Sequence, residues 1–121
     1  MREDQIRTIL TDLNGSSTDI EASALISADG LIIASALSAG MDEERISAMV
    51  AAMLSLGERT AAELSRGNLE QVMISGAQGH VLIVHAGNDA VLCAIAGKAI
   101  KLGLLLIDAS RAARAAAALL T

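Results

Sequence analysis

Three short apolar runs in the second half of the chain leave no room for helices between them. They are NLEQVMIS at 68–75, HVLIVHAG at 80–87 and AVLCAIA at 90–96. The short segments between them, GAQG and GND, have the composition of turns. Two parallel strands would need a long crossover connection, usually a helix. The spacing therefore predicts an antiparallel meander of three strands.

A turn signal in the first third of the chain predicts a separate hairpin. Asp29-Gly30 stands between the apolar runs ASALI and LIIA. These two residues supply the positive φ angles that a tight hairpin turn needs. The flanking runs are therefore predicted as paired antiparallel strands, and not as the start of a βα unit.

Helical periodicity accounts for three other segments. The first helix starts near the N-terminus and is expected to stop at Gly15 in a left-handed conformation. The second runs from Asp42, a good N-cap, to about Ser65, and the third lies in the alanine-rich residues 98–121. The order is α-β-β-α-β-β-β-α, which predicts one α+β domain over residues 1–121.

The composition argues against several classes of partner. The chain has 121 residues, a formal net charge of -5 and no Phe, Tyr or Trp. Single-stranded nucleic-acid binders stack bases on aromatic side chains, and phosphate backbones attract clustered Lys and Arg. We therefore expect no nucleic-acid partner.

The apolar segments also argue against insertion into a membrane. The most apolar stretch, residues 90–107, is interrupted by Lys98 and Lys101, and the N-terminus has no continuous apolar run of the signal-peptide kind. The single cysteine, Cys93, excludes an internal disulfide and fits a reducing compartment. We expect a soluble, cytoplasmic protein.

The second helix has no strongly polar side. Its apolar stripe is expected to pack on the sheet and comprises Ile46, Met49, Val50, Met53, Leu54, Gly57 and Leu64. The opposite side carries small residues, where a solvated helix usually carries charge: Ala48, Ala51, Ala52, Ser55 and Ala62. Either a partner covers this side, or alanine serves only as a surface helix former. We favour the partner.

The strand after this helix is a candidate for an open sheet edge, which needs cover. A twofold axis that pairs this strand and this helix with their copies would cover both surfaces with one interface. The predicted homodimer interface consists of Ala48, Ala51, Ala52, Ser55, Ala62, Leu69 and Val72.

Nothing in the sequence assembles a catalytic or metal site. His80 and His85 lie five residues apart in one predicted strand, so they point to opposite faces and cannot hold one ion together. Cys93 stands among apolar residues and is expected to be a small buried side chain. The glycine-rich turns lack the pattern of a phosphate-binding loop. We predict no catalytic residue, no cofactor, no metal and no enzymatic activity.

The order of elements and three stretches together resemble the Roadblock family, the dynein light chain relatives that include bacterial and archaeal regulators of Ras-like GTPases. The stretches are ALISADGLIIAS at 24–35, ELSRGNLEQVMI at 63–74 and AVLCAIAGKAIKLGLLLIDASRAA at 90–113. The resemblance implies a five-stranded antiparallel sheet in the order 2-1-5-4-3. It further implies the first and third helices on one face, the second on the other, and dimers through the third strand and second helix.

The resemblance also implies a function, because family members bind Ras-like GTPases or motor and scaffold subunits without being enzymes in their own right. We expect a homodimeric platform that binds and regulates a small GTPase. The alternative is a light-chain-like adaptor for a motor or scaffold, and a small-ligand sensor ranks last because few polar groups converge. The expected partner-binding residues are charged and border the small side of the second helix: Glu44, Arg45, Glu58, Arg59 and Arg66.

Overall fold

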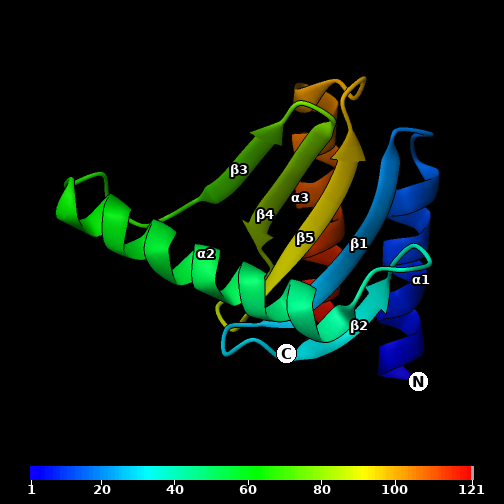
Figure 1. The fold of residues 1–121 in the computed structure, drawn as a ribbon. Coiled ribbons are helices and arrows are strands. Elements are labelled where there is room, and N and C mark those ends of the chain that lie inside the picture. The colour runs from blue at the N-terminus through cyan, green and yellow to red at the C-terminus, as the bar shows by residue number, and fades with distance from the viewer. Residues whose placement is uncertain (121) are drawn as a thin grey trace.

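The computed structural model describes residues 1–120, so the predicted end of the last helix at Thr121 lies outside the described residues. The elements follow the predicted order: α1 (Arg2–Gly15), β1 (Ile20–Ser27), β2 (Ile32–Ala36), α2 (Glu43–Glu63), β3 (Gln71–Gly76), β4 (Gly79–His85), β5 (Ala90–Gly97) and α3 (Leu102–Leu120). Figure 1 shows a three-layer arrangement, with α1 and α3 on one face of the sheet and α2 on the other.

The five strands form one antiparallel sheet in the order β2-β1-β5-β4-β3, as predicted. The meander pairs Met73 on β3 with Leu82 on β4, and Leu82 with Ala94 on β5. The first hairpin joins this meander through β1, where Leu25 pairs with Leu92. The predicted edge position of β3 is confirmed, and β2 forms the other edge.

The turn between β1 and β2 confirms the predicted hairpin but uses only one positive φ angle. Gly30 has φ 90°, whereas Asp29 keeps a negative φ. The Gly30 amide donates to the Ser27 carbonyl at 3.0 Å, and the Ser27 hydroxyl donates to Asp29 Oδ1 at 2.6 Å. This hydroxyl lowers the pKa of the Asp29 carboxyl.

The expected left-handed stop at Gly15 is wrong. Gly15 belongs to α1 and is not among the glycines with positive φ. The helix closes instead through Ser16, whose backbone amide and hydroxyl both donate to the Leu13 carbonyl, at 3.1 and 2.7 Å. A local side chain thus satisfies the last turn of the helix without a left-handed residue.

Helix α2 begins as predicted and ends slightly earlier. Asp42 Oδ1 accepts hydrogen bonds from the backbone amides of Glu44 and Arg45 at 3.0 and 3.3 Å, so it is a true N-cap. The helix ends at Glu63, and Ser65 takes a φ of 58°. This turn directs the chain toward the edge strand β3.

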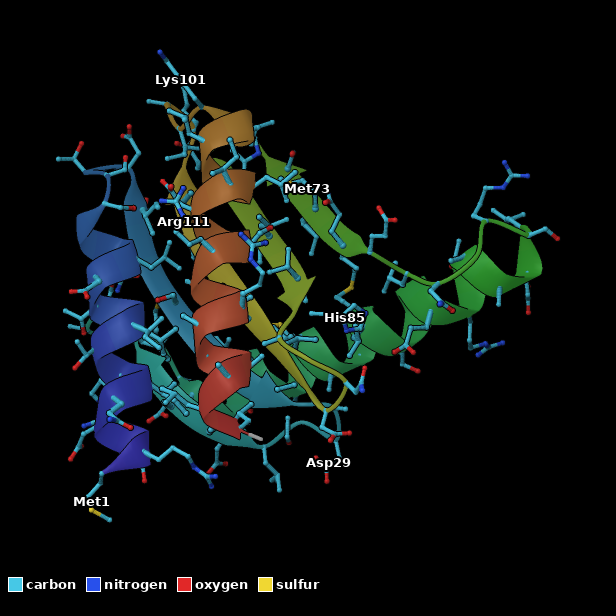
Figure 2. All side chains as sticks on the ribbon, turned by 180° about the vertical axis from the view of Figure 1, so that it is seen from behind. Met1, Asp29, Met73, His85, Lys101 and Arg111 are labelled. Carbon is cyan, nitrogen blue, oxygen red and sulfur yellow. The ribbon has the colours of Figure 1, made fainter. Side chains whose placement is uncertain are left out.

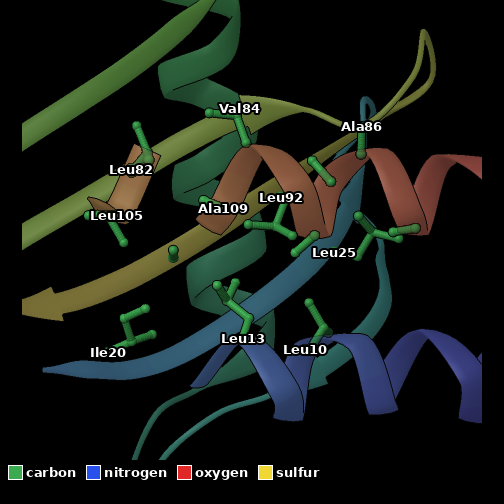
Figure 3. Packing of buried hydrophobic residues seen from close by; sticks show 14 of the residues in the cluster. Leu10, Leu13, Ile20, Leu25, Leu82, Val84, Ala86, Leu92, Leu105 and Ala109 are labelled. Carbon is green, nitrogen blue, oxygen red and sulfur yellow. The ribbon is translucent and has the colours of Figure 1, made fainter. Parts of the chain in front are cut away.

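The two faces of the sheet are covered unequally. The large core lies between the sheet and α1 and α3, where Leu10, Leu25, Leu92 and Leu105 are fully buried (Figure 3). The smaller core lies under α2 and contains Ala24, Ile26, Val50, Leu54, Ile83, Val91 and Cys93. Because a single helix covers this second face, apolar surface is left open beside it.

Candidate interaction surface on α2 and β3

Helix α2 crosses the sheet obliquely and extends beyond it. In Figure 1 its amino-terminal half lies over the strands, whereas its carboxyl-terminal half projects past the edge strand. Only Ser47, Val50 and Leu54 of the helix are buried. The other residues of α2 are exposed or half-buried.

The predicted apolar stripe of α2 is wrong at two positions. Met49 and Leu64 were expected on the sheet, yet their side chains are 53% and 63% exposed. Met49 lies on the flank of the helix, and Leu64 directly follows the overhanging half. Leu56, which the sequence analysis did not select, is 57% exposed. It stands seven residues after Met49, so the two lie on the same side of the helix.

An apolar groove runs between α2 and the open part of the sheet. Its volume is about 380 Å³, and no polar side chain lines it. Ile74 on β3, which is 40% exposed, forms part of its outer wall. The groove is lined by Ile46, Met49, Val50, Ala52, Met53, Ile74, Val81, Ile83, Cys93 and Ile95.

A second hollow lies along the overhanging half of α2, where the chain turns back toward β3. Its volume is about 360 Å³, and its lining is mainly apolar. It is lined by Met53, Leu56, Gly57, Thr60, Ala61, Leu64, Arg66, Leu69, Gln71 and Val72. We call the two hollows, the exposed side of α2 and the outer edge of β3 together the α2–β3 surface.

The predicted small side of α2 is exposed at four of its five positions. Ala48, Ala52, Ser55 and Ala62 are exposed, whereas Ala51 is half-buried. The turn at Gly30 explains the exception, because a Cβ atom placed on Gly30 would lie 3.3 Å from the Ala51 Cβ. Ala51 therefore contacts its own chain.

The two remaining residues of the predicted interface, Leu69 and Val72, are half-buried against α2. A Cβ atom on Gly57 would lie 3.1 Å from Leu69 Cδ2 and 3.2 Å from Val72 Cγ2. The absence of a side chain at Gly57 thus lets the segment before β3 approach the helix closely. Both residues belong to the α2–β3 surface but also hold its two parts together.

The five charged residues predicted to bind a partner are all exposed, but they do not form one cluster within the chain. Glu44 and Arg45 lie in the first turn of α2, whereas Glu58 and Arg59 lie in its overhanging half. At a helical rise of about 1.5 Å per residue, the two pairs stand roughly 20 Å apart. Arg66 lies beyond the helix, and its Nε donates to the Leu64 carbonyl at 2.9 Å.

The residues considered for chemistry lie apart from one another. His80 lies on the face of α1 and α3, and its Nδ1 is 2.8 Å from the Ser75 hydroxyl, whereas His85 is exposed on the other face. Cys93 is buried, and burial raises its thiol pKa to about 12. Over residues 1–120 no group of three or more His, Cys, Asp or Glu side chains could hold a metal ion. None of the described helices is long and apolar enough to cross a membrane.

The fold and this surface define a class of α+β domain with an open sheet edge and a half-covered helix. The chain belongs to the Roadblock/LC7 domain family, which it matches over residues 8–96. This confirms the resemblance drawn from the sequence.

Relatives in one archaeon cover nearly the same length. Uncharacterized protein MJ0310 of Methanocaldococcus jannaschii is 41% identical over 108 residues, which are 89% of this chain and 93% of that protein. Uncharacterized protein MJ0714 of the same organism is 39% identical over 114 residues, or 93% of this chain and 94% of that protein.

Solved structures share the fold at low sequence identity. A structure described as MglB with tetrameric arrangement has a TM-score of 0.87 at 17% identity, and covers 98% of this chain and 89% of its own. The gliding protein MglB from Thermus thermophilus has a TM-score of 0.86 at 16% identity, and the match covers 98% of this chain and 90% of that protein. The Roadblock/LC7 domain from Streptomyces avermitilis has a TM-score of 0.85 at 17% identity, with 90% and 92% covered.

Proposed function

We propose that this chain is a non-catalytic homodimeric platform that binds and regulates a Ras-like small GTPase. The observation that carries the proposal is the α2–β3 surface, where an unpaired strand edge adjoins a groove lined only by apolar side chains. Exposed edges and large apolar patches mark interaction sites in native proteins. Membership of the Roadblock/LC7 family supports both the dimer and the class of partner.

A second copy of the chain is the occupant that fits this surface best. A twofold axis beside β3 pairs the two edge strands antiparallel, so each satisfies the free backbone groups of the other. The same axis carries the overhanging half of each α2 toward the apolar groove of the other copy. Met49 and Leu56, both more than half exposed in one chain, then become buried.

The dimer also brings the charged residues together. When two α2 helices lie antiparallel, the first turn of one helix approaches the overhanging half of the other. Glu44 and Arg45 of one copy then stand near Arg59 and Arg66 of the second copy. The pairing thus forms one continuous surface from charges that lie at opposite ends of α2 in a single chain.

We propose that the GTPase binds across this composite surface with its switch loops, the segments that change with the bound nucleotide. In this scheme the platform aligns hydrolytic residues that the GTPase itself carries. The alternative is that the platform inserts an arginine into the active site of the GTPase, which would accelerate hydrolysis by several orders of magnitude. Arg59 is the candidate on α2 for that role.

The test is a pull-down of Ras-like GTPases from the same genome, each loaded with a GTP analogue or with GDP. We expect stronger binding in one nucleotide state, and weaker binding with Arg59→Ala. Turnover of GTP with the native protein and with Arg59→Ala then separates acceleration from scaffolding. Equal binding in both states would remove the regulatory proposal and favour the adaptor, and no binding in either state would overturn the choice of partner.

A further inference from the structure

A second exposed apolar feature lies on the opposite side of the molecule, on the outer side of α3. Leu104 and Ile107 are 54% and 53% exposed there. Figure 2 shows this side, where α1 and α3 lie next to each other across the sheet and Arg111 is labelled on α3. The α2–β3 surface does not include this region, so its dimer would leave α3 uncovered.

Four residues form one line along α3. Leu104, Asp108, Arg111 and Ala115 follow one another at spacings of four, three and four; Asp108 is half-buried and the other three are exposed. The average spacing is about 3.7 residues, close to the 3.6 residues of one helical turn, so the four residues lie on one side of α3. Along this line an apolar, an acidic, a basic and a small residue follow one another. A second copy that runs in the opposite direction therefore places the acid opposite the base and the apolar residue opposite the small one.

A hollow of about 340 Å³ lies between this line and α1. Ile9 and Leu13 of α1 and Ala112 and Ala115 of α3 give it an apolar lining, and Asp12, Ser16, Asp108 and Arg111 complete it. It thus offers room for an apolar side chain next to Ala115. Leu104 lies three turns before Ala115 on the same helix. It is an exposed apolar side chain of a size that the hollow of a second copy could accept.

Asp108 and Arg111 are the charged residues of α3 that line the hollow. Neither Asp108 nor Arg111 makes an ion pair within residues 1–120. The hollow is lined by two carboxylates and one guanidinium, so a further cation would be favourable there. A second copy of α3 would supply that cation through its own Arg111.

We infer that two copies of this chain associate through α3, in an antiparallel helix pair whose twofold axis passes between Ala109 and Ser110. In this register Leu104 of each copy enters the hollow beside Ala115 of the other. Asp108 of each copy faces Arg111 of the other, so the pair forms two reciprocal ion pairs. The contact is separate from the α2–β3 surface and therefore builds species larger than the α2–β3 dimer.

Sedimentation velocity from micromolar to millimolar concentration tests this inference on three variants. Asp108→Arg places two arginines face to face, and Arg111→Asp does the same with two aspartates. Because of the twofold axis each substitution changes two contacts, so we expect each to weaken the association by about tenfold or more. The double variant Asp108→Arg with Arg111→Asp restores both pairs and should associate within about threefold of the native protein.

A matched control is Arg7→Glu, an exposed residue of α1 that does not line the hollow. It should leave the association unchanged. The α3 variants are also measured in a protein that carries Ser55→Arg, which removes the proposed α2–β3 dimer. There the association through α3 should appear as a monomer–dimer equilibrium, weakened by each single substitution and restored by the double variant. The inference is overturned if the Ser55→Arg protein stays monomeric at millimolar concentration, or if the double variant associates no better than the single ones. Neither result depends on whether the α2–β3 dimer exists.

Discussion

Gly57 of α2 and Val72 of β3 lie so close that a Cβ atom on Gly57 would stand 3.2 Å from Val72 Cγ2. A side chain at this position forces the side chains of Leu69 and Val72 to shift. Gly57→Val is therefore expected to lower the free energy of unfolding by about 1–3 kcal/mol through overpacking. Denaturant titration at fixed protein concentration measures the loss.

Gly103 provides the matched control for this prediction. It also lies in a helix, but no heavy atom lies within 4 Å of a Cβ atom placed there. Gly103→Ala should leave stability unchanged or raise it by up to about 1 kcal/mol, because alanine restricts the unfolded chain. Unchanged stability for Gly57→Val would show that the close contact with Val72 does not control position 57.

The proposed dimer predicts different results for two neighbouring substitutions on α2. Ser55 is exposed, so Ser55→Arg should leave the fold intact but bury an unpaired charge in the helix pair and give monomers. Ala51 contacts the turn at Gly30, so Ala51→Arg should also lower the melting temperature. Light scattering reports the mass and circular dichroism the fold. A native protein that is monomeric at tens of micromolar would contradict the proposed dimer.

Asn14 joins α1 to two strands. Its Nδ2 donates to the Ala36 carbonyl at 2.9 Å, and the buried Ser23 hydroxyl donates to its Oδ1 at 2.8 Å. Asn14→Ala removes both hydrogen bonds and leaves the Ser23 hydroxyl with the Leu10 carbonyl, at 3.2 Å, so it should lower the free energy of unfolding by about 1–3 kcal/mol. Gln5→Ala, at an exposed amide on the same helix, serves as the control and should change little. Thermal and denaturant unfolding compare the two.

The buried thiol of Cys93 predicts a dependence of stability on alkaline pH. Burial raises its pKa from 9.0 to about 12. Between these values the unfolded thiol ionises while the native one stays protonated, so unfolding releases a proton and stability falls as pH rises. The stability difference between the native protein and Cys93→Ala should therefore be constant below pH 9 and shrink above it. A thiol reagent at neutral pH should label Cys93 only after unfolding.

The order of the elements and the sheet edge followed from local features of the chain. Turn residues stand between short apolar runs, and runs joined by so few residues can pair only as antiparallel neighbours. The N-cap at Asp42 was equally local, because a carboxylate and the amides it caps lie within three residues. The resemblance to the Roadblock family then supplied the order of the strands, which pairing rules alone leave open.

What only the tertiary structure decided is where each helix meets the sheet and where it leaves it. Helical periodicity places Met49 on the apolar side of α2, but it contains no information on the oblique angle at which the helix crosses the strands or on where the sheet beneath it ends. That geometry leaves Met49 exposed and buries part of Ala51 against Gly30. The hollow between α1 and α3 likewise joins Ile9 to Ala112 across about a hundred residues of sequence, a proximity that arises only when both helices pack on the same face of the sheet.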